Sequence, residues 1–443
     1  MLRPPGLRLS WSFALTLFAF ADAAMPACNP AAGTDDGGGG SSPSNGTGGS
    51  GIDGSGGGPG GGSGGKSGGG TGGNGMVAGS GGTSGGTGGG AAGGIGVVTS
   101  VPCDRQVDNV APSIDPPGGL TADKVPMFVM LGFDDNAFAD GINWALDNLR
   151  ERKNADGTAV RSTFFISAGF DSEFFNPAGG QSEADLLAAW KKIKADDHEI
   201  ANHTWSHGEN LMGADTATWT AELTKANNLF TTTLGLQQCQ VAGFRTPFLG
   251  FSQSTFDAVK AAGFVHYDAS IEFGYDWWQA AGQPMGWSPG APLSGQHYYW
   301  PFTMDGPFLL GFYNKGVTPN PGMWEIPVYT FNKINGDMAS TVTGFDYNLW
   351  TKCQSDSTFD FTSVLKTSLD QRLMGNRSPF AIGAHTDNYS QFNESANSVW
   401  TTFNYQVRRK ALSDFIDYAL SKPEVRMVRF IDVINWMRHP TPL

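Results

Sequence analysis

Two histidines four residues apart, His203 and His207, are the pair in this sequence best suited by type and spacing to grip a metal ion. In a helix, or in a strand that turns into a first helical turn, side chains at positions i and i+4 lie on one side. Neutral imidazole nitrogens placed in this way bind divalent metals. Two unrelated histidines can share this spacing by chance, so the metal interpretation needs further ligands.

A pair of adjacent carboxylates, Asp134 and Asp135, follows the apolar run Phe128–Phe133. The run predicts a buried strand that ends at the two acids. Neighbouring residues on a strand point to opposite sides, so one acid can hold a metal while the other faces a substrate. Asp135 with His203 and His207 would give the metal one carboxylate and two imidazoles, and would leave positions open for water and substrate.

The scaffold that must position these residues is predicted to alternate strands with helices. This alternation favours an α/β fold with parallel strands joined by helical crossovers. The predicted strands are 125–133, 162–167, 199–202, 240–244, 264–267, 324–331, 379–384 and 425–433. The predicted helices are 143–152, one that starts at Ser182, 218–233, 254–262, 361–374 and 401–420, and an aromatic insertion spans 272–321.

Polar residues gather at the C-terminal ends of these predicted strands, the face where parallel barrels carry their chemistry. They are Asp134, Asp135, His203, His207, Arg245, Asp268 and His385. Asp134 could take a proton from a metal-activated water while Arg245 holds it ionised. His385 could protonate a leaving nitrogen, with Asp268 keeping the ring oriented and charged. Each residue alone has an ordinary structural explanation, but their shared position favours catalysis.

The first 100 residues are expected to carry no packed fold. Residues 1–27 have a basic start, a short apolar run and small residues after it, which is typical of a signal peptide. Residues 28–100 are rich in glycine and serine and poor in apolar residues, so burial cannot offset the entropy of ordering them. We expect a disordered tether there and a catalytic domain over residues 101–443.

Four cysteines leave both the anchoring and the disulfide pairing open. Cys28 follows the signal segment and precedes the tether, as in bacterial lipoproteins, so the protein is expected to be secreted or anchored to the cell envelope by lipid. An exported chain allows one disulfide among Cys103, Cys239 and Cys353. We favour Cys239 with Cys353, because both lie inside the predicted folded domain, and three buried thiols are the alternative.

The formal net charge of −13 argues against a nucleic acid partner. An acidic chain is compatible with a neutral or basic polymer. Aromatic clusters at 277–278 and 298–300 suggest stacking on sugar rings, although most aromatic residues of a large domain fill its core.

The motifs together resemble the polysaccharide deacetylases with a NodB homology domain. They are Gly132–Asp135, His203–His207, Arg245–Phe248 and His385, in this order, and the likeness covers residues 125–433. Three further segments resemble the chitin deacetylase branch: Tyr267–Ser270, Trp300–Thr303 and Trp324–Pro327. The resemblance implies a distorted (β/α)7 barrel of the NodB homology type. Members of this family remove N-acetyl groups from GlcNAc polymers or O-acetyl groups from xylan with a metal-bound water.

The resemblance also implies a role for each site residue. Asp134 would be the base and His385 the acid, with Arg245 positioning the former and Asp268 the latter. The metal ligands would be Asp135, His203 and His207, and the ion Zn²⁺, with Co²⁺ or a similar divalent ion as the alternative. The backbone N–H of Phe248 would stabilise the oxyanion.

Three positions depart from the family pattern. Gly132 stands where threonine is more frequent, and Phe248 where tyrosine is frequent, yet neither change removes a catalytic group. Gly383 stands two residues before His385, where the family places a leucine. This change thins the apolar wall expected around the acetyl methyl group.

The leading hypothesis is a secreted or surface-anchored, metal-dependent and monomeric deacetylase that acts on the N-acetyl groups of chitin or peptidoglycan. One alternative is a related barrel hydrolase that cleaves acetylxylan or a small amide. The long aromatic insertion favours a polymer cleft over a small enclosed pocket. A non-catalytic wall-binding protein on the same scaffold is the other alternative, but the full set of ligands and acid argues against it.

Overall fold

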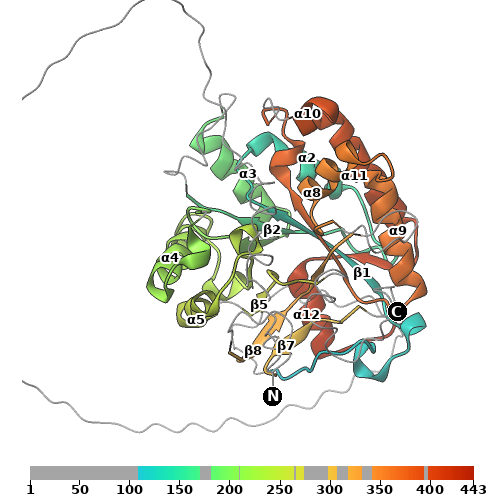
Figure 1. Ribbon diagram of the computed structural model, residues 1–443, viewed down its shortest axis with the longest axis horizontal. Coiled ribbons are helices and arrows are strands. Elements are labelled where there is room, and N and C mark those ends of the chain that lie inside the picture. Colours follow the sequence, from blue (N-terminus) through green and yellow to red (C-terminus); the bar gives the residue numbers. More distant parts are fainter. Residues whose placement is uncertain are drawn as a thin grey trace, which may run out of the picture. The chain divides into compact units, whose positions relative to one another are not determined.

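One large sheet runs through the fold, and its strand order largely follows the chain (Figure 1). The computed structural model describes residues 108–169, 181–208, 210–263, 266–273, 298–306, 318–331, 342–393 and 398–443. In these residues the strands pair in the order β10-β1-β2-β3-β4-β5-β8-β7, and β11 pairs with β1. The pairings from β10 through to β8 are parallel, whereas β7 runs antiparallel to β8.

The strands of this sheet are mostly short, apart from β1, β8 and β10. They are β1 (Met127–Asp134), β2 (Thr163–Ile166), β3 (Glu199–Asn202), β4 (Gly243–Phe244), β5 (Tyr267–Asp268), β7 (Phe302–Met304), β8 (Asn320–Glu325), β10 (Phe380–His385) and β11 (Val425–Met427). A second sheet pairs β6 (Glu272–Phe273) with β9 (Val328–Tyr329).

The seven parallel strands from β10 to β8 form an incomplete barrel. The gap between its two ends is covered by other parts of the described chain. Strand β9 contacts β10, and Phe345 forms an isolated parallel bridge with Gly383 of β10. This arrangement confirms the predicted distorted (β/α)7 fold.

Helices follow the strands and cover the sheet (Figure 1). They are α2 (Ala139–Arg150), α3 (Glu183–Ala195), α4 (Thr216–Thr232), α5 (Gln253–Ala262), α8 (Asp346–Ser355), α9 (Phe361–Met374), α10 (Ser398–Thr402), α11 (Tyr405–Leu420) and α12 (Phe430–Arg438). The predicted cap of α3 is confirmed, because Ser182 accepts a hydrogen bond from the backbone of Asp185 in a capping box. Helix α5 is capped by Ser252 rather than Ser254, and it ends at Gly263 with φ +74°, as predicted.

Local breaks overturn several predicted element bounds in the second half of the chain. The strand predicted at 425–433 ends at Met427, because Arg429 and Asp432 form a capping box that starts α12. The helix predicted at 401–420 is two helices, the second capped by Asn404. The strand predicted at 324–331 is divided between β8 and β9, and helix α8 was not predicted at all.

Strand β1 separates two apolar layers. Its residues alternate between them, with Val129, Leu131 and Phe133 in one cluster and Phe128 and Met130 in the other. The first cluster packs under the surrounding helices and the second packs against α12. Because both faces of β1 are buried, its sequence is apolar throughout until the acids at its end.

Helix α12 covers the end of the barrel at which the parallel strands begin. The backbone N–H of Phe430 donates to the hydroxyl of Thr163 at the start of β2 (3.0 Å). The next N–H, of Ile431, donates to Oε2 of Glu199 at the start of β3 (3.2 Å). Glu199 also accepts hydrogen bonds from Thr163 (2.7 Å) and Tyr267 (3.0 Å). A buried carboxyl group therefore ties the first helical turn of α12 to the barrel.

The buried Glu199 should make the stability of the fold depend on pH. Burial raises the pKa of Glu199 from 4.5 to about 7, so the folded state keeps a proton that the unfolded state has lost. The free energy of unfolding should thus fall by about 3 kcal/mol as pH rises from about 4.5 to about 7. Glu199→Gln keeps the accepting oxygen and should remove this part of the pH dependence, measured by urea unfolding at several pH values.

Burial also raises the pKa of Glu272 to about 7, so the Glu199→Gln variant still has a contribution from Glu272 to the pH dependence of its stability. The difference between wild type and Glu199→Gln isolates the contribution of Glu199. Equal slopes in the two proteins would contradict the assignment.

The favoured disulfide is wrong. Cys239 is disulfide-bonded, but Cys353 is a free thiol, and burial raises its pKa to about 12. The alternative of three buried thiols is wrong as well, because Cys239 is not a thiol.

Other predictions fall outside the described residues and stay predictions. They are the signal peptide at 1–27, the tether at 28–100, the start of the catalytic domain at 101 and the aromatic pair at 277–278. In the described part of the chain, no helix has both the length and the apolar character needed to cross a bilayer.

Candidate functional site

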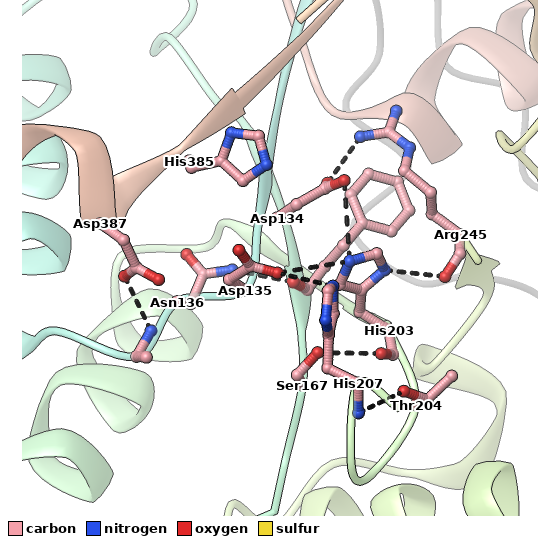
Figure 2. A network of polar contacts seen from close by, with 12 residues as sticks. Asp134, Asp135, Asn136, Ser167, His203, Thr204, His207, Arg245, His385 and Asp387 are labelled. Carbon is pink, nitrogen blue, oxygen red and sulfur yellow. Dashed lines mark hydrogen bonds and ion pairs between the residues drawn. The ribbon is translucent and has the colours of Figure 1, made fainter. Parts of the chain in front are cut away.

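The site lies where β1, β3, β4 and β10 end (Figure 2). Asp134 is the last residue of β1 and His385 the last of β10, and the two are paired in register across the sheet. Arg245 follows β4 directly, and His203 follows β3. Parallel strands deliver their C-terminal ends to one edge, which explains why residues so far apart in the chain meet here.

Three predicted metal ligands converge on one point. Oδ1 of Asp135 lies 3.1 Å from Nε2 of His207 and 3.5 Å from Nε2 of His203. The three ligand atoms lie within 4.8 Å of one another. One carboxylate and two imidazoles at such distances could each reach a shared ion with a bond of about 2 Å.

The protonation of these side chains fits a cation. Nδ1 of His203 lies 2.8 Å from the backbone carbonyl oxygen of Arg245, which assigns the ring proton to Nδ1 and leaves a lone pair on Nε2. Burial acts to raise the pKa of Asp135, but the neighbouring His207 and His203 outweigh it and hold the pKa well below its usual value. Among the described residues, the buried Oδ1 of Asp135 accepts no hydrogen bond. A divalent ion would satisfy these converging acceptors.

The backbone around the site is strained. Six non-glycine residues here have positive φ, a region that costs roughly 1–3 kcal/mol for each such residue when its surroundings hold it there. They are Asp135 (65°), Asn136 (65°), Thr204 (74°), His207 (51°), Phe248 (55°) and Leu249 (53°).

His203 and His207 lie just after strand β3, as predicted, but in a bend rather than in a helix or a first helical turn. They flank an irregular turn with positive φ at Thr204, and their ring centroids are 5.0 Å apart. The turn is held by a hydrogen bond from the backbone of His207 to the hydroxyl of Thr204 (3.1 Å). This local backbone conformation, rather than helical periodicity, points both rings toward Asp135.

Asp134 is held by Arg245. Nη1 of Arg245 donates to Oδ1 of Asp134 (2.6 Å), and Nε donates to the backbone oxygen of Ala269 (2.9 Å). The guanidinium is fully buried and lies over the ring of Phe165, 4.1 Å from its centroid. The other oxygen, Oδ2 of Asp134, lies 3.8 Å from Nε2 of His203. The carboxylate is therefore fixed beside the ligand cluster with one oxygen turned toward it.

The carboxylate behind His385 is Asp346. Its Oδ1 lies 2.7 Å from Nδ1 of His385, and its Oδ2 accepts the backbone N–H of the same residue (3.1 Å). Asn388 donates to Oδ1 as well (3.0 Å). Burial disfavours the charged ring, but Asp346, with smaller contributions from Asp135 and Asp134, raises the pKa of His385 to about 10. Protonated His385 thus has a proton on Nε2 to give.

Asp268 does not have the predicted role of orienting His385. Its oxygens accept hydrogen bonds from the hydroxyl and the backbone N–H of Ser270 (2.7 and 3.1 Å). It is paired in register with Glu325 on β8, and burial raises the pKa of both carboxyl groups. The partner of His385 was assigned wrongly because polar residues were sought at strand ends, whereas Asp346 lies in the first turn of the unpredicted helix α8.

Phe248 lies beside the ligands. Its ring packs edge-on against His207, with centroids 4.7 Å apart. Its backbone N–H donates to no backbone oxygen of the described residues, and its role as a donor to a substrate oxygen stays a prediction. The positive φ at Phe248 belongs to a tight 3-10 turn, Pro247–Leu249, that follows Arg245.

Asp387 is a site residue to which the sequence assigned no role. Its Oδ1 accepts the backbone N–H groups of Ala137 (2.8 Å) and Phe138 (3.1 Å), so it holds the loop after the two acids (Figure 2). Thr386 donates to the side chain of Asn136 in the same loop (3.0 Å). The segment after His385 therefore fixes the loop that carries Asp135.

Exchange of Asp346 and Asp268 for asparagine should separate their roles. Asp346→Asn removes the charge that keeps His385 protonated, so the alkaline limb of the pH–rate profile should move down by about one pH unit or more. Asp268→Asn is the matched control, because it removes a buried carboxyl group that does not contact His385. An unchanged alkaline limb in a folded Asp346→Asn protein would contradict the assignment.

Several known proteins are similar to this chain. Residues 122–267 match the sequence model of a family described as polysaccharide deacetylase. Chitin deacetylase 8 of Bombyx mori is 23% identical over 357 residues, which cover 78% of this chain and 80% of that protein. A chitin deacetylase of Pestalotiopsis sp is 26% identical over 153 residues, covering 34% of this chain and 45% of that protein. A solved peptidoglycan deacetylase from Bacillus subtilis is 11% identical with a TM-score of 0.35, covering 71% of this chain and 92% of that one.

The matched region contains the predicted base and all three predicted ligands, but it ends before Asp346 and His385. The structure brings these two residues to the site. His385 ends β10, which lies beside β1 in the sheet, and Asp346 contacts His385.

Proposed function

We propose that this chain, whose residues 122–267 form a polysaccharide deacetylase domain, hydrolyses the N-acetyl groups of a GlcNAc-containing polysaccharide with a divalent metal. One observation carries the proposal: the ligand cluster of Asp135, His203 and His207 lies beside two paired strand ends, which carry a carboxylate fixed by Arg245 and the ring of His385, held by Asp346. Amide hydrolysis needs a base and an acid on either side of a polarised carbonyl.

The side chains divide the reaction between them. A metal held by Asp135, His203 and His207 would polarise the carbonyl and lower the pKa of water. Asp134 takes a proton from the water whose oxygen adds to the carbonyl carbon. The backbone N–H of Phe248 donates to the oxygen that gains charge. His385 then gives the proton on Nε2 to the amide nitrogen as the C–N bond breaks, which yields acetate and a free amine.

Zn²⁺ is the metal that we propose. Two imidazole nitrogens and one carboxylate oxygen, in a site with open positions, suit Zn²⁺, which is a borderline-soft ion. Co²⁺ accepts similar ligands, so metal analysis of protein purified without added metal, followed by reconstitution with each ion, distinguishes them.

The substrate that we propose is chitin-like. The support is that the two similar curated proteins are chitin deacetylases. The test is acetate release from chitin oligomers, peptidoglycan and acetylxylan, each with and without chelator. Chelator-sensitive release from chitin oligomers is the expected result. Release from peptidoglycan or acetylxylan alone would replace the proposed substrate, and no release from any of them would contradict a deacetylase.

We propose that the protein acts outside the cytoplasm, either secreted or anchored by lipid through Cys28. We also propose that it is a monomer. The support is the segment 1–27 and the cysteine that follows it. Radiolabelled palmitate incorporation that is lost in Cys28→Ser would support the anchor, and release of unlabelled protein into the medium would support free secretion. Gel filtration tests the oligomeric state.

A further inference from the structure

The ring of Phe345 occupies the space of the side chain that Gly383 lacks. A Cβ atom built on Gly383 would lie 2.2 Å from Cδ1 and 2.3 Å from Cε1 of that ring. No side chain at position 383 can therefore coexist with the ring in its present place. Since residues two apart on a strand share a face, Gly383 and His385 both face the same side of β10, and the ring fills the layer next to His385.

A second glycine lies beside the first. Gly132 of β1 is paired in register with Gly383, just as Asp134 is paired with His385 one step further along. A Cβ atom on Gly132 would lie 3.0 Å from Nη1 of Arg245. The two glycines thus open adjacent spaces below the base and the acid. The guanidinium of Arg245 and the ring of Phe165 fill the space at Gly132, and the ring of Phe345 fills the space at Gly383.

Phe345 borders both halves of the catalytic site. Its ring centroid lies 5.9 Å from that of His385 and 5.2 Å from the guanidinium carbon of Arg245, which holds Asp134. The acyl carbon must lie within reach of both the base and the acid. The ring of Phe345 is thus an apolar surface close to both His385 and Arg245, and Phe345 is nearly buried, with 5% of its surface exposed.

The segment that carries Phe345 is fixed from both sides. The carboxyl group of Glu272 accepts the backbone N–H of Gly344 (2.8 Å), and the backbone oxygen of Gly344 accepts the N–H of Gly383. The next residue, Asp346, holds His385. The ring therefore cannot withdraw without disturbing the residue that orients the acid.

We propose that Phe345 is the wall of the acyl pocket and the residue that restricts the enzyme to a two-carbon acyl group. This inference rests on the proposed deacetylase function. A rigid ring at this place leaves no room for a longer acyl chain, whereas a smaller side chain would leave room for one.

The test measures kcat/KM on chito-oligosaccharides that carry N-acetyl, N-propionyl or N-butyryl groups. Phe345→Ala should raise the ratio of butyryl to acetyl hydrolysis by about tenfold or more, since each methylene in an apolar pocket changes discrimination by about 10–200-fold. Phe345→Leu removes less volume and should give an intermediate ratio. Phe345→Ala combined with Gly383→Leu puts a side chain back into the same space and should restore the preference for acetyl.

Phe359→Ala is the matched control, because it removes a buried ring just after α8 that is not at the site. It should leave the ratio unchanged. An unchanged ratio in folded Phe345→Leu and Phe345→Ala would overturn the inference while the deacetylase assignment stands. Absence of acetate release by the wild type from every substrate would instead overturn the proposed function.

Discussion

Replacement of Asp134 by asparagine should lower kcat/KM for acetate release by about 10²–10⁴-fold, the range that a positioned proton acceptor contributes. Asparagine has the same shape and keeps an oxygen for the hydrogen bond from Arg245, which lies 2.6 Å away in the wild type. It cannot take a proton from water. The loss should therefore appear in kcat, with little change in KM.

Metal content separates this prediction from a simple loss of the site. Asp134 is not one of the three ligands, so Asp134→Asn should bind the same amount of metal as the wild type. A variant that keeps the full rate would refute Asp134 as the base. A variant that loses metal would show that this carboxylate is instead a ligand.

Complete removal of the metal should abolish measurable acetate release, a loss of about 10³-fold or more, because a metal contributes several kcal/mol of stabilisation in the transition state. Readdition of Zn²⁺ should restore the rate. His207→Ala should have the same effect, since Nε2 of His207 is the ligand atom closest to Oδ1 of Asp135 (3.1 Å). Metal content and acetate release are measured on the same samples.

A histidine outside the site provides the control. His439 follows α12 and is not in the ligand cluster, so His439→Ala should keep both metal and activity. Activity that survives full chelation, or a His207→Ala protein that binds metal as tightly as the wild type, would count against the metal site.

The sequence predicted the first half of the barrel well, because its strands and helices have clear periodicity and clear ends. Strand β3 was predicted with its observed bounds, and the capping box of α3 was recognised from Ser182 and Asp185. The second half was harder to predict. Short strands such as β4, with two residues, and the change from β11 to α12 depend on tertiary contacts and caps rather than on period.

The site was predictable where function coincided with strand ends. Asp134, Asp135, Arg245 and His385 lie at or just after the ends of strands and come together as expected. Asp346 could not be found in this way, because it starts a helix 39 residues before His385. The acid at the start of residues 346–355 was the one available signal, as acidic residues favour the first turn of helices.

Strand β1 is the first strand in the sequence, but its partners on one side are the last two strands, β10 and β11. It pairs with β10, which ends at His385, and with β11, which ends at Met427. Pairing over such long separations is slow, because the entropy of closing a long loop is lost before any stabilising contact forms. The centre of the sheet therefore cannot be completed during synthesis until the chain has been made at least as far as Met427.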